Sequence, residues 1–284
     1  MSRVSDSPSA WEIGPPRLPQ ETTAIRALAR AYDLLATWPR RPDYLDHLLE
    51  GGRVAVARGP VGVVGYGGAF VGPGQTHLTD LFVHAGETGR GVGGAILTAL
   101  ELDPAKTSTF ASADPRAQTL YRRLGLRTLD RLSYLVGGAE EVERLSRRLE
   151  RGTVSPGADT EQAIEKHLAM RGGLHGAATM SFLVETARPV IWESGYAWLR
   201  IATDRVCVGP MGSHDPTTAA SVVCDALLEA TRQRPTVQLF VAHSHPAHAA
   251  LIESGFTTND VDIFMAGDRS LIDLARYCPD PDLG

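Results

Sequence analysis

Four glycines stand within six residues, at positions 89, 91, 93 and 94, and this segment limits the fold more than any other feature of the sequence. It separates an apolar stretch with strand character, residues 76–83, from an apolar stretch with helix character, about residues 91–102. The start of a helix presents unpaired backbone N–H groups and the positive end of the helix dipole, and glycine lets a ligand approach that backbone closely. The segment from Glu87 to Gly94 is therefore predicted to be an anion-binding turn, with a purely structural turn as the alternative.

A dinucleotide-binding turn of the Rossmann type would also bind phosphate groups at a glycine-rich helix start. That turn needs the order Gly-x-Gly-x-x-Gly and a following parallel strand that ends in an acidic residue. Here the turn is preceded by two strands, residues 53–58 and 61–71, which flank the turn Gly59-Pro60 and predict an antiparallel hairpin. The Rossmann alternative is therefore discounted.

The order of expected elements occurs twice along the chain. In the first half, the pattern predicts helices at 21–36 and 44–49, the hairpin, the strand and helix around the turn, a strand at 107–113, a helix at 114–125, a strand at 127–136 and a charged helix at 139–151. In the second half, it predicts helices at 160–171 and 177–185, strands at 191–201 and 205–210, a helix at 216–232, a strand at 236–242, a helix from Pro246 and a strand at 260–265. A duplicated α/β unit follows, with a linker at 152–157 and domains at 1–150 and 151–284.

One part of the repeat can be compared letter by letter. Asp114-Pro115 up to Gly125-Leu126 matches His245-Pro246 up to Gly255-Phe256, and each pair of motifs follows an apolar strand. Proline at a helix start and glycine at its end are also general helix signals. The shared order of all three features nevertheless favours duplication.

Composition excludes several classes of protein. No apolar run approaches the roughly 18 residues needed to span a bilayer, and the polar, Pro-rich residues 1–16 do not resemble a secretion signal, so we expect an irregular start and a cytoplasmic protein with no membrane contact. The net charge of −5 gives no footprint for nucleic acid. The three cysteines show no metal-like spacing, and no metal is expected.

The string from Asp80 to Gly93 resembles the coenzyme A motif of the GNAT superfamily of N-acetyltransferases. In that family the turn reads Gln/Arg-x-x-Gly-x-Gly/Ala, which places Thr88 at the Gln/Arg position and Gly91 and Gly93 at the small positions. Thr88 departs from the pattern, although Arg90 could supply a charged contact. The segment Asp114–Leu126, with Tyr121 before Gly125-Leu126, is similar to a second motif of the family. The resemblance implies a tandem protein of two GNAT-like domains, each a mixed, mostly antiparallel twisted sheet flanked by helices.

The resemblance also implies a set of site residues. Acetyl-CoA would be the cosubstrate, bound by the following residues: Phe82, Val83, Thr88, Gly89, Arg90, Gly91, Val92, Gly93 and Gly94. The backbone N–H groups around Phe82 and Val83 would polarise the thioester carbonyl. Tyr121 would protonate the coenzyme sulfur as the general acid, with a core tyrosine as the alternative. Asp80 would act as the base, directly or through water, with a structural aspartate as the alternative; His84 is a further candidate.

The second half lacks these features. Its equivalent loop, Val206–Ala220, has glycine only at 209 and 212, and Leu251 aligns with Tyr121. We therefore expect a degenerate domain that forms part of the substrate cleft. The close spacing of His243, His245 and His248 is a weak metal signal without a carboxylate or cysteine nearby. Trp192, Tyr196 and Trp198 alternate along the expected strand at 191–201 and line either a substrate wall or a buried face.

These expectations define a function with open alternatives. The chain is predicted to transfer an acetyl or other short acyl group from coenzyme A to a primary amine of a small molecule by direct attack. The alternatives are a non-catalytic acyl-CoA sensor or interaction protein, and a peptide or protein N-acetyltransferase. The sequence leaves a homodimer open and does not identify the acceptor.

Overall fold

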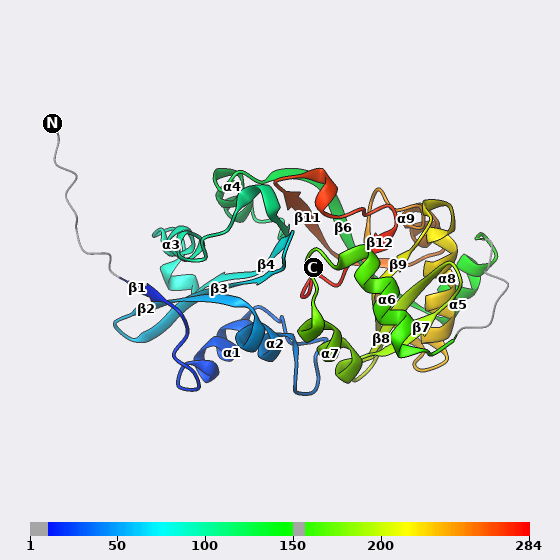
Figure 1. The fold of residues 1–284 in the computed structure, drawn as a ribbon, viewed down its shortest axis with the longest axis horizontal. Helices are drawn as coiled ribbons and strands as arrows, with labels where there is room; N and C mark the ends of the chain where they lie inside the picture. The colour runs from blue at the N-terminus through cyan, green and yellow to red at the C-terminus, as the bar shows by residue number, and fades with distance from the viewer. Residues whose placement is uncertain (1–10, 150–156) are drawn as a thin grey trace.

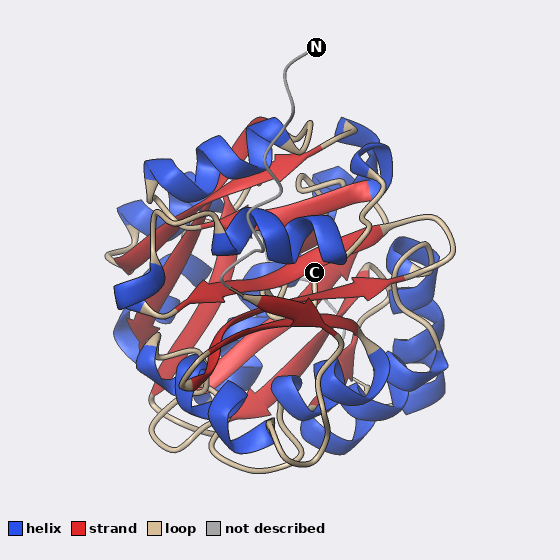
Figure 2. Cartoon of the chain, turned by 90° about the vertical axis from the view of Figure 1, so that its left-hand side faces the viewer, coloured by secondary structure: helices blue, strands red, loops and turns tan. Residues whose placement is uncertain are grey.

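The strands of the protein join into one long sheet. The computed structural model describes residues 11–149 and 157–284, and the strand order is β1-β2-β3-β4-β5-β11-β6-β10-β9-β8-β7, with β12 paired to β9. Helices cover both faces of the sheet (Figure 2). The two halves of the chain occupy opposite ends of the molecule, and the C-terminus lies between them (Figure 1).

The first half supplies the sheet from β1 to β6. Its elements are β1 (Glu12–Gly14), α1 (Thr22–Ala31), α2 (Tyr44–Gly51), β2 (Arg53–Gly59), β3 (Gly62–Val71), β4 (Thr76–Val83), α3 (Val92–Ala99), β5 (Thr107–Ala111), α4 (Pro115–Arg123), β6 (Arg127–Gly138) and α5 (Ala139–Ser146). The irregular start expected for residues 1–16 is wrong at β1, which pairs with β2. The helix expected at 139–151 ends at Ser146, and the expected linker lies outside the described residues apart from Gly157.

The second half repeats this order. Its elements are α6 (Thr160–Arg171), α7 (Ala177–Thr186), β7 (Arg188–Ile191), β8 (Gly195–Ile201), β9 (Val206–Ser213), α8 (Ala219–Thr231), β10 (Thr236–Ala242), α9 (His248–Glu253), β11 (Thr257–Ala266) and β12 (Tyr277–Cys278). The single strand expected at 191–201 is wrong. The chain turns at Trp192, whose N–H donates to the carbonyl of Gly195, and this turn makes β7 and β8 an antiparallel pair.

The halves are joined by an exchange of their last strands. Strand β11 of the second half lies between β5 and β6, while β6 of the first half lies between β11 and β10. All neighbouring strands are antiparallel except β4–β5 and β9–β10, which confirms a mixed, mostly antiparallel sheet. Each half therefore completes its sheet with a strand of the other.

The register of the exchanged strands follows the internal repeat. The spacing that matches Gly125 with Gly255 makes Leu132 equivalent to Asp262, and these two residues face each other across β6 and β11. On either side, Tyr134 pairs with Asp260 and Asp130 with Phe264, so equivalent residues change places. The halves are thus related by an approximate twofold axis at Leu132 and Asp262.

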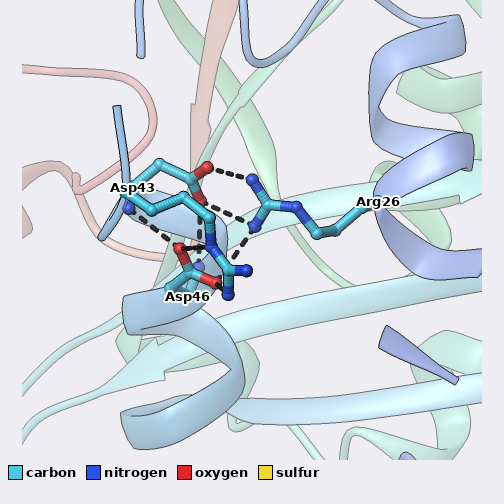
Figure 3. Close-up of polar contacts among 4 residues, drawn as sticks. Arg26, Asp43 and Asp46 are labelled. Atoms are coloured by element: carbon cyan, nitrogen blue, oxygen red, sulfur yellow. Dashed lines mark hydrogen bonds and ion pairs between the residues drawn. The ribbon is translucent and has the colours of Figure 1, made fainter. Parts of the chain in front are cut away.

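A buried ion-pair network holds α1 against α2 (Figure 3). Arg26 on α1 donates to Asp43 (3.1 Å) and Asp46 (3.0 Å), and all three side chains are almost fully buried. Asp43 caps α2 by accepting from the Asp46 N–H, while Asp46 accepts from the Asp43 N–H, which is a capping box. The network therefore fixes the N-terminus of α2, where Tyr44 begins the helix.

Two apolar cores cover the opposite faces of the first-half sheet. On one face, α3 and α4 pack on β2–β5, and a Cβ at Gly67 would lie 2.7 Å from Ile96, so glycine permits this close approach. On the other face, α1, α2 and α7 share a core that includes Tyr196 and Trp198 of β8. The described ranges contain no helix long and apolar enough to cross a membrane.

Candidate active site

Strands β4 and β5 separate within the first half. Their parallel pairing covers only Thr76 with Thr107 and His77 with Ser108. The Thr109 hydroxyl then donates to the Leu78 carbonyl (2.8 Å), and beyond that point, among the residues that the structure describes, β4 pairs only with β3. Within the described structure, residues Asp80–Val83 thus have a strand neighbour on one side only, and we call their other side the unpaired edge of β4.

The hydrogen bonds between β3 and β4 determine which way the backbone groups of β4 point. The His84 N–H donates to Val64 (2.8 Å), and hydrogen-bonded pairs alternate along antiparallel strands. The N–H of Phe82 therefore faces β3, whereas that of Val83 faces the unpaired edge. The Tyr32 hydroxyl donates to the Val83 carbonyl at this edge (2.7 Å). Of the two predicted oxyanion donors, Val83 is the one placed to meet a ligand.

Asp80 lies on the face of β4 that is covered by α1 and α2. Its carboxylate accepts from the hydroxyls of Tyr66 (2.8 Å) and Tyr44 (3.4 Å), and only 2% of the residue is exposed. Burial raises the pKa of Asp80 to about 7, against the opposing effect of the two tyrosine hydrogen bonds. A carboxyl with a pKa near 7 can take up a proton close to neutral pH.

Tyr121 lies on the other face, in the core under α3 and α4. It packs with Leu78, Leu81 and Val83 of β4, and its hydroxyl makes no hydrogen bond within residues 11–149 and 157–284. Burial raises the pKa of this phenol above its ordinary value, with further contributions from the charges of Asp80 and Asp262. The structure thus brings Tyr121 and Asp80 to the same stretch of β4 from opposite faces.

The glycine turn leaves β4 at its C-terminal end. Gly89 and Gly91 have positive φ angles of 80° and 92°, and a Cβ at either would meet no atom within 4 Å. Gly91 is the N-cap of α3, whose first residue, Val92, is buried. The turn therefore exposes backbone at the start of a helix, which is suitable for a pyrophosphate.

The charged side chain of this turn is already paired. Arg90 donates to Glu87 (2.8 Å) and lies over the ring of Trp11, which also donates to Glu87 (3.3 Å). The Thr88 hydroxyl contacts the His84 carbonyl (3.4 Å), and exposed His84 caps the short turn Ala85–Glu87. Phosphate binding by Arg90 would have to compete with Glu87.

The C-terminal segment brings second-half carboxylates next to Asp80. Asp282 accepts from the Trp38 indole N–H (2.7 Å), and Asp280 forms a buried ion pair with Arg200 (2.9 Å). Burial raises the pKa of Asp282 well above its usual range, and the charges of Asp280 and then Asp80 add to this. Asp280, Asp282 and Arg200 therefore lie on the same side of the sheet as Asp80.

The comparisons with known proteins agree with this geometry. Residues 50–127 match the family model of the acetyltransferase (GNAT) domain. The chain contains a GNAT acetyltransferase domain. No curated protein matches the sequence.

Solved structures extend the likeness beyond the matched GNAT domain. A proposed acetyltransferase from Pyrococcus horikoshii shares 14% identity over 97% of this chain and 96% of that chain (TM-score 0.70). A GCN5-related N-acetyltransferase from Sphaerobacter thermophilus shares 12% identity over 98% of this chain and 99% of that chain (TM-score 0.58). A tandem GNAT protein from the clavulanic acid biosynthesis pathway shares 16% identity over 90% of this chain and 97% of that chain (TM-score 0.58). At these identities the likeness shows a shared fold, that of a tandem GNAT protein.

The second half differs from the GNAT domain where β9 and β10 separate. They pair at Val206–Val208, after which Met211 and Gly212 pair with β8 on one side and with β12 on the other. Because β8 takes one edge of β9, β12 must take the edge that faces β10. The position equivalent to the unpaired edge of β4 is thus filled by the chain itself, and Leu251 lies fully buried at the position of Tyr121.

The other candidates of the second half have structural contacts. His243 and His248 share the Ser133 hydroxyl (3.0 and 3.1 Å), while His245 accepts from the Ala247 N–H. Within the described ranges, no group of three or more His, Cys, Asp or Glu residues is placed to hold a metal. Trp192, Tyr196 and Trp198 are all buried, which favours the core interpretation over a substrate wall.

Sequence reasoning missed the partners of Asp80. Tyr66 stands among glycines in β3, a pattern of close packing that could have drawn attention to it. Tyr44 and Asp282 come from distant segments, and their residue types carry no signal by themselves. Their role becomes visible only once the fold brings α2 and the C-terminal segment to β4.

Proposed function

We propose that the GNAT domain transfers an acetyl or other short acyl group from its coenzyme A ester directly to a primary amine of a small molecule. The observation that carries this proposal is the placement of Asp80 and Tyr121 on opposite faces of the unpaired edge of β4. One group can take up a proton and the other can donate one, and both face the same segment of backbone. Direct transfer needs both roles.

The proton balance assigns a role to each group. The amine nitrogen attacks the thioester carbonyl carbon, and Asp80 takes the proton that the nitrogen loses, directly or through water. The N–H of Val83 stabilises the oxyanion. When the carbon–sulfur bond breaks, Tyr121 gives its proton to the departing thiolate. The product amide and free coenzyme A leave, and a proton passes from Asp80 back to Tyr121 through solvent.

The carboxyl groups near Asp80 support an amine acceptor. Burial raises the pKa of Asp80, Asp280 and Asp282 above the ordinary value, and Arg200 is engaged with Asp280. A carboxyl with a raised pKa holds a proton more readily than an exposed one, so it can take the proton that an attacking amine loses. The acceptor side is built partly by the second half, which supports a role for residues 151–284 in the cleft beside a catalytic domain of residues 1–150.

The strand pairing supports a single coenzyme site per chain. A pantetheine chain would lie along the unpaired edge of β4, and β12 occupies the equivalent edge of β9. We therefore propose that the second half is a degenerate domain. Calorimetric titration with acetyl-CoA should give one site per chain, whereas two sites would contradict this part of the proposal.

Tyr121→Phe tests the mechanism. It removes the proposed acid, so kcat should fall by about 10²- to 10³-fold while the Kd for acetyl-CoA changes by less than about twofold. Tyr196→Phe is the matched control, because its buried hydroxyl has no hydrogen-bond partner in the described structure. Equal kcat values for wild type and Tyr121→Phe would remove the assignment of the acid.

The alternative functions can be distinguished with the same wild-type and variant proteins. Binding of acetyl-CoA without turnover of any amine would favour an acyl-CoA sensor. A higher kcat/KM for peptides than for small amines would favour a peptide N-acetyltransferase. The pairing of Arg90 with Glu87 does not favour the sensor, because the turn still leaves open space beside its backbone at Gly89 and Gly91.

A further inference from the structure

Arg171, the last residue of α6, is buried without an acidic partner. Only 1% of it is exposed, and no carboxylate lies within ion-pair distance among residues 11–149 and 157–284. Its Nη1 donates to the Gln75 side chain (2.7 Å) and the Leu271 carbonyl (3.0 Å), whereas Nε and Nη2 have no partner in the described structure. A buried guanidinium usually lies against an anion, since burial of an isolated charge is strongly unfavourable.

The neighbours of Arg171 do not supply negative charge. Its guanidinium lies over the ring of Tyr277 at 5.3 Å, and its positive charge lowers the pKa of His77, His167 and His175 further than burial does alone. These histidines are therefore neutral near pH 7. Neutral rings cannot compensate the charge in the way that a carboxylate or phosphate does.

A small cavity of about 150 Å³ lies at this position. It is lined by Arg171, Tyr277, His214, Asp273 and Arg276, among others. Asp273 is engaged by the Arg276 side chain (2.7 Å), and Arg276 also donates to the His214 carbonyl (3.0 Å). One positive charge of the cavity, that of Arg171, is therefore left unbalanced.

The small cavity adjoins a larger one of about 560 Å³, with which it shares Ala169 and His214. Lys166 lines the larger cavity and donates to His214 Nε2 (2.8 Å). Glu165 and Glu193 line it as well. A ligand with one anionic group could enter past Lys166, whereas the two glutamates disfavour a molecule with many negative charges.

We propose that this part of the second half is a binding site for a small molecule that carries a single carboxylate or phosphate group. The anionic group lies in the small cavity beside Arg171, and Arg276 and His214 complete its surroundings. The rest of the ligand lies in the larger cavity. Because Arg171 also donates to Gln75, which directly precedes β4, the ligand would stabilise the junction between the two halves.

Thermal unfolding of the full chain tests the site without any measurement of activity. Inorganic phosphate and acetate are added separately, with chloride at equal ionic strength as the reference. At least one of them should raise Tm in a saturable way, by about 3–8 °C when it exceeds its Kd by ten- to a hundredfold. The anion that gives the larger shift identifies the group for which the site is built.

Two variants locate the effect. Arg171→Met should abolish the shift, and Arg276→Gln, which leaves Arg171 in place, should weaken the Kd from calorimetry by about tenfold. Arg232→Met, at a surface ion pair with Glu229, is the control and should respond like wild type. If Arg171→Met does not fold, Arg276→Gln decides alone. The proposal is overturned if neither anion exceeds chloride in wild type, or if Arg276→Gln binds as wild type does.

Discussion

Asp80→Asn is expected to inactivate the protein and at the same time to stabilise it. The pKa of Asp80 rises from an ordinary value of 3.8 to about 7 on folding. A difference of about 3 pKa units corresponds to about 4 kcal/mol of folding free energy at pH values above the folded pKa. Asn has nearly the same shape and has no charge to bury, and its carbonyl oxygen can still accept from Tyr66.

The pH dependence gives the sign of the effect. Between pH 3.8 and about 7 the folded state holds a proton that the unfolded state has lost. The free energy of unfolding of the wild type therefore falls as pH rises through this window. Above the window, Asp80 causes no further loss of stability. The variant has no such loss. In urea unfolding, the stability gained by Asp80→Asn should therefore be about 4 kcal/mol at pH 8 and about 2–3 kcal/mol smaller at pH 5.

Asp80 should also control enzymatic activity, and the substitution that raises stability should lower activity. The kcat/KM of the wild type should rise with pH to a plateau, with an apparent pKa of about 7, and Asp80→Asn should lower it by about 10²- to 10⁴-fold. Asp33→Asn, at an exposed position after α1, is the control and should keep the kcat/KM of the wild type. If Asp80→Asn shows the same stability difference at pH 5 and pH 8, the argument from burial is refuted.

Three further substitutions test the arrangement of the fold and the turn. Arg26→Met leaves Asp43 buried without a guanidinium partner, while Asp46 keeps its ion pair with Arg41, and should cost about 3 kcal/mol in urea unfolding; a loss of stability below 1 kcal/mol would contradict the network. Gly137→Ala places a Cβ 2.6 Å from the Phe256 ring, so the free energy of unfolding should fall by about 1–3 kcal/mol if β6 packs against Phe256 of the second half as described. Glu87→Gln frees Arg90 and should tighten acetyl-CoA binding by about two- to fivefold in low salt, an effect that 0.5 M salt should remove; an unchanged Kd in low salt would show that Arg90 does not reach the coenzyme.

Much of the local structure could be predicted because local signals determine it. The hairpin of β2 and β3 is marked by apolar runs around Gly59-Pro60, and the bounds of β4 and β10 follow their apolar stretches. The error at residues 191–201 has the same origin. The Ser194-Gly195 turn signal lies between aromatic residues, and the alternation of Trp192, Tyr196 and Trp198 suggested a continuous strand.

The exchange of β6 and β11 could not be predicted in this way. A strand shows which of its faces is apolar, but its residues do not name the strand beside it, because backbone hydrogen bonds are the same for every partner. Prediction of the candidate site was limited in the same way. The motif indicated Asp80 and Tyr121, whereas the tyrosines that hold the carboxyl and the segment that brings Asp282 depend on contacts between distant parts of the chain.

The strand exchange also affects synthesis of the protein on the ribosome. The edge of β5 pairs with β11, which leaves the ribosome about 155 residues later, so at 5–20 residues per second this edge stays uncovered for roughly 8–31 s. An uncovered edge strand can pair with other chains. The protein should therefore depend on chaperones during translation more than a chain of two self-contained domains would. A gene cut near codon 150 would yield two fragments that each lack the strand needed to close their sheet.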